Sequence, residues 1–239
     1  MFQILRRSLL CLLCVWALNS CAPAVKQMPA PVTAVVSEAA DYPADLKGAR
    51  LYRIAPEQSQ LHILVYRAGR LAQLGHNHVL SSGTLSGYVW LHDSLSRSGF
   101  SLLLPVNELI VDDPQARITE GADFPPAVPD EDRAGTRRNM LKPEQLDGEQ
   151  YPIIRLRSLS IEGTRETPEV RVQVVIKDQV RELAVPVNVA ATPQLLRASG
   201  QFDVRLTEFG IKPFSVLMGA LQVQDQLAIK FDLVALPVH

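Results

Sequence analysis

Apolar residues alternate with other residues over most of the chain beyond residue 49, and this period of two restricts the fold more than any other feature. The alternation is clearest at Leu61, Ile63 and Val65 and at Leu85, Val89 and Leu91. Neighbouring side chains of a β-strand lie on opposite faces of a sheet, so the pattern predicts strands. Further strand-like runs are residues 100–106, 153–161, 170–189, 198–206 and 227–236.

Short turn signals separate these runs. They are Ala68-Gly69, Ser81-Ser82-Gly83, Ser96-Arg97-Ser98-Gly99, Glu162-Gly163 and Lys177-Asp178. Strands joined by such short connections pair antiparallel. The sequence therefore predicts an all-β meander, either closed into a single antiparallel barrel or folded into a sandwich.

Several predicted strands are apolar on both faces, as in Leu102-Leu103-Leu104 and Tyr88-Val89-Trp90-Leu91. A sandwich needs only one apolar face on each strand. In a barrel that encloses an apolar ligand, both faces of each strand can be apolar. Both faces are also apolar where the second face of a strand packs against another segment of the chain. The sequence leaves these two explanations open.

One long interval, residues 112–150, breaks the alternation. It contains a proline cluster at 125–129 and two acidic runs, Asp112-Asp113 and Asp130-Glu131-Asp132, which we interpret as solvated loop residues. A short helix is predicted over residues 137–146. Intervals of this length in a compact domain usually cover something or do something, and a cap on the end of the barrel and a ligand gate both fit.

The first twenty residues have the parts of an export signal: Arg6 and Arg7, an apolar run over residues 8–18, and small or polar residues after it. The run is too short to span a bilayer, which takes about 20 apolar residues. Residues 18–21, Leu-Asn-Ser-Cys, are similar to the lipobox of bacterial lipoproteins. We therefore expect cleavage before Cys21, acylation of this residue by chains such as palmitate, and a periplasm-facing protein anchored in a membrane, most simply the outer membrane.

Cleavage would leave an Ala/Pro-rich tether over residues 21–48 and one domain over residues 49–239. The other two cysteines, Cys11 and Cys14, lie in the signal, so the mature chain would have no free thiol or intramolecular disulfide. It would keep 22 of the 24 basic residues against 25 acidic ones, which gives no electrostatic case for binding nucleic acid.

No catalytic motif occurs, so we expect no enzyme and assign no catalytic residue and no cofactor.

Three segments together resemble the YceI-like family of lipocalin-like barrels that bind polyisoprenoids and related lipids. They are YRIAPEQS at 52–59, DGEQYPIIRLRS at 147–158 and VVIKDQVRELAVPV at 174–187, followed by Phe209-Gly210-Ile211 and the last strand. The likeness covers most of residues 51–235. Lys177-Asp178 replaces the family's His-Gly hairpin, and Asn139 or Met140 replaces a histidine, so no role is transferred from those histidines and the chain represents a divergent branch.

The resemblance implies a lipocalin-like barrel, with the 112–150 interval as a loop and short-helix insertion, that holds an isoprenoid or another long-chain lipid as a carrier or sensor. Candidate ligand-binding aromatic residues are Tyr66, Trp90, Phe100, Phe202 and Phe214. A different class of function, an envelope interaction module with a filled barrel, remains open. The size of the interior distinguishes the two.

His76 and His78 are the most conspicuous polar pair. Their spacing puts both imidazoles on one face of a strand, and His62 and His92 lie on neighbouring predicted strands. Three interpretations stay open: structural hydrogen bonding, contact with a ligand headgroup, and a metal or haem site. We assign no metal ligand, because no Asp or Glu accompanies these histidines at a ligand-like spacing in the sequence.

Overall fold

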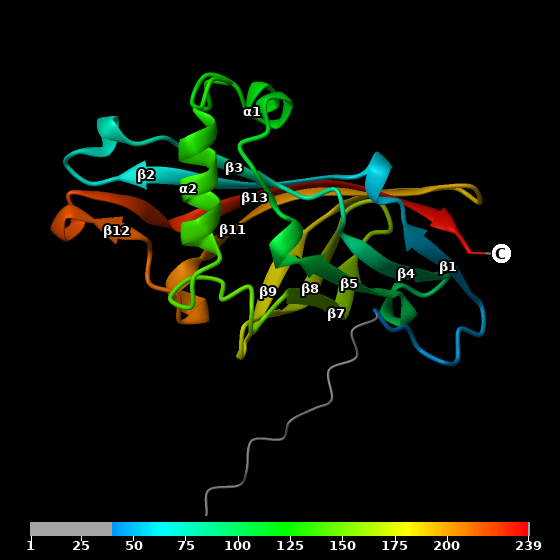
Figure 1. The fold of residues 1–239 in the computed structure, drawn as a ribbon. Helices are drawn as coiled ribbons and strands as arrows, with labels where there is room; N and C mark the ends of the chain where they lie inside the picture. The colour runs from blue at the N-terminus through cyan, green and yellow to red at the C-terminus, as the bar shows by residue number, and fades with distance from the viewer. Residues whose placement is uncertain (1–39, 239) are drawn as a thin grey trace, which may run out of the picture. The chain divides into compact units, whose positions relative to one another are not determined.

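An antiparallel sheet of 13 strands makes up about half of residues 40–238, the part of the chain that this computed structural model describes (Figure 1). The strands are β1 (Ala49–Ile54), β2 (Gln60–Ala68), β3 (His78–Ser81), β4 (Ser86–His92), β5 (Gly99–Pro105), β6 (Ile110–Val111), β7 (Ile153–Gly163), β8 (Pro168–Ile176), β9 (Gln179–Pro186), β10 (Asn188–Ala191), β11 (Leu196–Arg205), β12 (Ser215–Val216) and β13 (Leu221–Pro237). The signal, Cys21 and most of the tether lie outside the described residues.

Helices are few in this part of the chain. The α-helices are α1 (Pro114–Glu120) and α2 (Asp130–Met140). The 3-10 helices are η1 (Pro56–Gln58), η2 (Ala72–Leu74), η3 (Leu95–Arg97), η4 (Val106–Glu108), η5 (Leu206–Phe209) and η6 (Leu217–Gly219). No helix among the described residues is long and apolar enough to cross a bilayer.

The strand order only partly follows a meander. The pairs β4–β5, β7–β8 and β8–β9 follow the predicted turns, and β5 pairs with β7 across the long interval. At the beginning of the chain the order differs, because β1 pairs with β4 and β13 while β2 pairs with β3 and β13. The long strand β13 also pairs with β11, so the last strand joins the two halves of the sheet.

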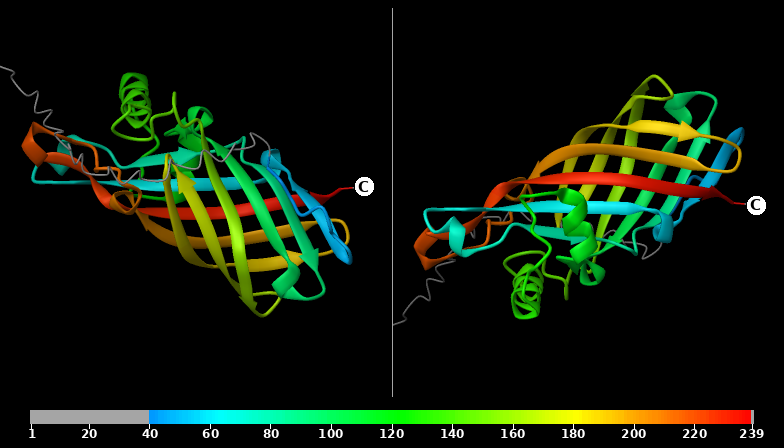
Figure 2. Two further views of the ribbon diagram at one scale, coloured as in Figure 1. Left: turned by 90° about the horizontal axis from the view of Figure 1, so that it is seen from below. Right: turned by 90° about the horizontal axis from the view of Figure 1, so that it is seen from above.

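The expected closed barrel is not confirmed, because the sheet is open between β9 and β11. These strands run side by side, yet no ladder pair joins them in the described residues. A Cβ added to Gly200 of β11 would lie 2.6 Å from the carbonyl oxygen of Pro186, the last residue of β9. Proline has no N–H to donate there. The chain then continues into β10, which pairs with β11 instead. Figure 2 shows the strongly curved sheet from two sides.

Two separate hydrophobic clusters lie on the two faces of β2, whereas β4 and β5, whose apolar runs the sequence singled out, contribute residues only to the main core. In β2, Leu61 faces the main core, whereas Leu64 belongs to a second cluster on the other face with Val79 of β3, Ala116 of α1 and Phe124. The interval that breaks the alternation therefore packs its first helix against the outer face of the sheet. Packing against another segment of the chain explains the second apolar face of β2 and β3.

The two helices of this interval differ from the sequence prediction. Helix α1 was not predicted; it begins at Pro114, and the Asp113 carboxylate caps it by accepting from the backbone N–H groups of Gln115 and Ala116. Helix α2 begins seven residues before the predicted helix. Its first turn is the acidic run 130–132, which is favoured there by the positive end of the helix dipole. The run is therefore helical and not a loop, although its three residues are exposed, as expected from the sequence.

Candidate functional site

An apolar cavity of about 220 Å³ lies inside the curved sheet. Side chains from β1, β2, β4, β5, β7, β8, β9, β10, β11 and β13 line it. The alternation of the sequence builds these walls directly. On β8, for example, Val170, Val172, Val174 and Ile176 all face the interior, because every second residue lies on the same face of a strand.

Three of the predicted aromatic residues, Trp90, Phe100 and Phe202, line this cavity. Trp90 lies over Gly99, where an added Cβ would be 2.5 Å from the indole ring. Phe202 meets Phe231 of β13 edge to face, with ring centroids 6.2 Å apart. Such edge-to-face contacts are favourable and fix both ring planes.

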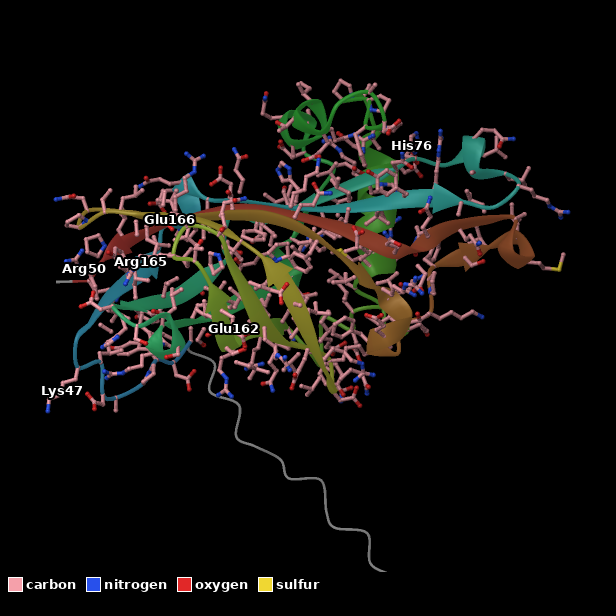
Figure 3. The ribbon with its side chains drawn as sticks, turned by 180° about the vertical axis from the view of Figure 1, so that it is seen from behind. Lys47, Arg50, His76, Glu162, Arg165 and Glu166 are labelled. Atoms are coloured by element: carbon pink, nitrogen blue, oxygen red, sulfur yellow. The ribbon has the colours of Figure 1, made fainter. Side chains whose placement is uncertain are left out.

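The two ends of the cavity differ in chemistry. One end is closed by Phe209 of η5, whose side chain is buried. The other is formed by Leu95 and Ser98 near η3 and by Arg165 in the turn between β7 and β8. Arg165 is the one charged side chain lining the cavity in the described part of the chain, and its Nη2 donates to the carbonyl oxygen of Asp93 at 2.5 Å. Figure 3 shows Arg165 and Glu166 at the same end of the sheet as Arg50, far from His76.

The other four predicted ligand-binding residues do not line the cavity. Tyr66 points to the outer face of the sheet, where its ring packs against Phe124 at a centroid distance of 5.4 Å. Phe214 lies beside β12, outside the walls. His76 and His78 precede and begin β3, next to the helical interval rather than the interior.

His78 belongs to a buried polar cluster around Asp112. The Asp112 carboxylate is 2.6 Å from the Nδ1 of His78, accepts from the N–H of Val79 at 2.9 Å and pairs with Arg117. Burial alone would raise the pKa of Asp112. The hydrogen bond and charge of His78, the Val79 N–H and the Arg117 charge outweigh that effect and lower the pKa below its ordinary value. Asp112 is therefore a buried anion that fixes the start of the interval, and not a solvated residue.

A second cluster fixes the end of α1. The two oxygens of Glu120 lie 2.7 Å from the Nδ1 of His62 on β2 and 2.6 Å from the Nζ of Lys230 on β13. Burial would raise the pKa of Glu120, but the Lys230 and His62 contacts outweigh it, and the net pKa is lowered. The clusters at both ends of α1 thus hold it against the outer face of the sheet.

These contacts bear on the possible metal site. The Nδ1 atoms of His62 and His78 contact different carboxylates, and the Nδ1 of His92 accepts from the N–H of Ser94 at 2.8 Å. Within residues 40–238 no group of three or more His, Cys, Asp or Glu side chains could hold a metal ion. Sequence reasoning missed the partners of these histidines because they lie 34 and 58 residues away along the chain.

Comparison with known proteins agrees with the fold. The model of the YceI-like domain matches residues 52–235, and the chain belongs to that family. A search of curated protein sequences found no match. Among solved structures, BcnA of Burkholderia cenocepacia is similar with a TM-score of 0.56 at 14% identity, over 76% of this chain and 98% of BcnA. A polyisoprenoid-binding domain of Saccharophagus degradans, implicated in plant cell wall breakdown, is similar with a TM-score of 0.50 at 8% identity, over 78% of this chain and 98% of that one. At these identities the likeness concerns the fold alone.

Proposed function

We propose that this protein binds one long apolar molecule, a polyisoprenoid or a related lipid, in the cavity of its curved sheet, as a carrier or sensor and without catalysis. The observation that carries the proposal is the cavity wall: strands from the whole sheet contribute apolar side chains, with one charged residue at one end. Each methylene buried in such a site contributes about 0.8 kcal/mol. The polyisoprenoid-binding domain with a similar fold supports the choice of ligand class.

The proposal includes the membrane anchor. Acylation at Cys21 would hold the domain at the periplasmic side of a membrane, the outer membrane in the simplest case, through the tether of residues 21–48. A carrier or sensor of an apolar molecule benefits from this position, because its ligand partitions into the bilayer. Mass spectrometry of the N-terminal peptide of protein extracted from membranes tests this part; an unmodified Cys21, or a chain that retains residues 1–20, would exclude it.

Ligand binding is tested by filling the cavity. Ala198 of β11 faces the interior, so Ala198→Phe adds volume where the ligand would lie. Native mass spectrometry after gentle extraction should detect a bound lipid in the wild-type protein and much less in the variant. Val180→Phe is the matched control, because Val180 is 48% exposed on the neighbouring strand β9. An empty wild-type protein that also ignores added isoprenoids would contradict the proposal.

The alternative of an interaction module with a filled barrel is not favoured, because large side chains do not fill the interior: a cavity of about 220 Å³ remains. The metal alternative is not favoured, because no group of three or more His, Cys, Asp or Glu side chains in residues 40–238 could hold a metal ion, and His76 and His78 lie outside the cavity where a haem would be enclosed. We therefore put forward no second function.

A further inference from the structure

The end of the sheet away from the C-terminus carries a cluster of exposed apolar side chains. Two segments form it, residues 69–75 with η2 and residues 216–221 with η6, and we call them together the tip. They project beyond the other strands with the ends of β2 and β13 (Figures 1 and 2). Leu74 is 67% exposed, Leu217 61% and Met218 fully exposed.

Backbone contacts join the two segments of the tip. The N–H of Leu71 donates to the carbonyl oxygen of Ala220 at 2.8 Å. A Cβ added to Gly69, whose φ is +90°, would lie 2.5 Å from the same oxygen, so the two loops are closely packed. The exposed apolar side chains therefore extend from one packed unit.

The backbone at Leu217 and Met218 is strained. Their φ angles are 51° and 55°, in the left-handed region that residues with branched or bulky side chains rarely adopt. Strain of this kind costs about 1 to 3 kcal/mol per residue and clusters at functional sites. Here it accompanies two apolar side chains that face solvent, an arrangement that offers no compensation within the described structure.

The two chain segments that form and flank the tip carry basic but no acidic residues, and the Asp132 carboxylate of α2 lies 4.0 Å from the imidazole of His76, which follows the tip. The sequence has no Asp or Glu from residue 67 to residue 92 and none from 209 to 224. Within these segments Arg67, Arg70 and Lys212 are exposed. An apolar tip flanked by cations is complementary to an anionic lipid surface, where each Lys or Arg near the surface contributes about 1 kcal/mol.

We propose that the tip inserts into the interface of an anionic bilayer through Leu74, Leu217 and Met218. The combination of a projecting apolar end and chain segments with basic but no acidic residues distinguishes it from the other exposed apolar residues, such as Ile118 and Val180, which lie singly on other elements. Single exposed apolar residues are normal, whereas a contiguous group marks an interaction surface. This inference goes beyond ligand binding in the cavity and does not depend on it.

The test reports the surroundings of the tip directly. In the full chain, Cys11, Cys14 and Cys21 are each changed to Ser, and one cysteine is introduced at Met218 or, as a control, at Ile118, and labelled with a polarity-sensitive fluorophore. Both proteins keep the same N-terminal segment, so any vesicle binding by that segment is common to them. Vesicles of phosphatidylglycerol and phosphatidylcholine should shift the emission of the label at 218 to the blue, with a smaller shift in pure phosphatidylcholine and none at 118.

A second variant removes the apolar surface and keeps the backbone. Leu217→Asn with Met218→Asn is suited to this, because Asn tolerates the left-handed region better than most residues. With the label at Leu74→Cys, this variant should need about a hundredfold more anionic vesicles for half of the shift, since each of the two large apolar side chains that leave the interface costs about tenfold. Unchanged thermal melting establishes that the fold is intact.

Three results would overturn the inference. The first is no shift at 218 for protein that sediments with the vesicles, and the second is an equal shift at 218 and 118. The third is a shift that depends on protein concentration without vesicles, which would mean contact with a second copy. Ala198→Phe should keep the shift at 218 while losing cavity ligand, so failure of the tip and failure of the cavity are distinguished.

Discussion

His76 and His78 lie two residues apart, but their side chains have different surroundings. The His78 side chain is 14% exposed and bonded to a buried carboxylate, whereas that of His76 is 41% exposed with its Nδ1 4.0 Å from Asp132. We expect His78→Ala to lower the free energy of unfolding by about 1 to 3 kcal/mol, because Asp112 loses a buried partner. His76→Ala should change it little. Denaturant unfolding of both variants measures the difference.

The same pair tests the metal interpretation. Metal and haem content should be equal in the wild-type protein and in both variants, because neither imidazole belongs to a ligand set among the described residues. Stoichiometric zinc or haem that His76→Ala removes would contradict this expectation.

At the residue scale, the sequence predicted that aromatic residues of the strands line a cavity, but alternation alone did not tell which of them face it. Trp90, Phe100 and Phe202 lie where the alternation and the family likeness led us to expect them. Tyr66 does not, because β2 is apolar on both faces and the alternation alone does not tell which face is inside. No sequence pattern pointed to Arg165, because it lies in a turn and reaches the end of the cavity only in the folded chain.

Helix α1 is held at its end by one buried carboxylate, so its docking should depend on pH. The pKa of Glu120 is lowered from its ordinary value of 4.5, because Lys230 and His62 outweigh the effect of burial. A group with a lowered pKa stabilises the fold above its ordinary value, and this contribution is lost as the pH falls through the lower folded value. We therefore expect Glu120→Gln to lower the stability at pH 7 by about 1 to 2 kcal/mol.

The difference between the wild type and Glu120→Gln should shrink as the pH falls below 4.5, the ordinary value of this carboxyl. Unfolding curves from pH 7 to pH 3 measure it. Glu149→Gln, at an exposed turn position outside the helices, is the control and should follow the wild-type curve. A difference that stays constant over this range would show that the charge of Glu120 does not hold α1.

At the element scale, strands with short turns were predictable, because alternation and turn residues are local signals. The five predicted turns all separate consecutive strands. Helix α1 was missed because its seven residues are too few for a helical period. What stabilises it are the distant partners of Asp112 and Glu120, and contacts over such distances have no local signature.

At the scale of the whole molecule, the sequence did not determine which distant strands pair with each other. Alternation indicates that a strand has an inner face but not which strand lies beside it. The pairing of β13 with β1, β2 and β11 joins residues far apart in the chain. The missing ladder between β9 and β11 depends in part on Pro186, which was read from the sequence only as part of the family motif.

The open side of the sheet should be visible in hydrogen exchange. Strand β8 and residues 153–157 of β7 are paired on both sides, whereas β9 is paired only with β8, and β11 beyond Gly200 only with β13. An amide that points to an unpaired edge has no backbone acceptor, and we expect about half of the amides in residues 179–185 and 201–205 to exchange much faster than those of β8 and residues 153–157. Exchange followed by mass spectrometry of peptides from these strands measures this. Equal protection of β9, β11 and β8 would mean that the two edges pair in solution and close the sheet into a barrel.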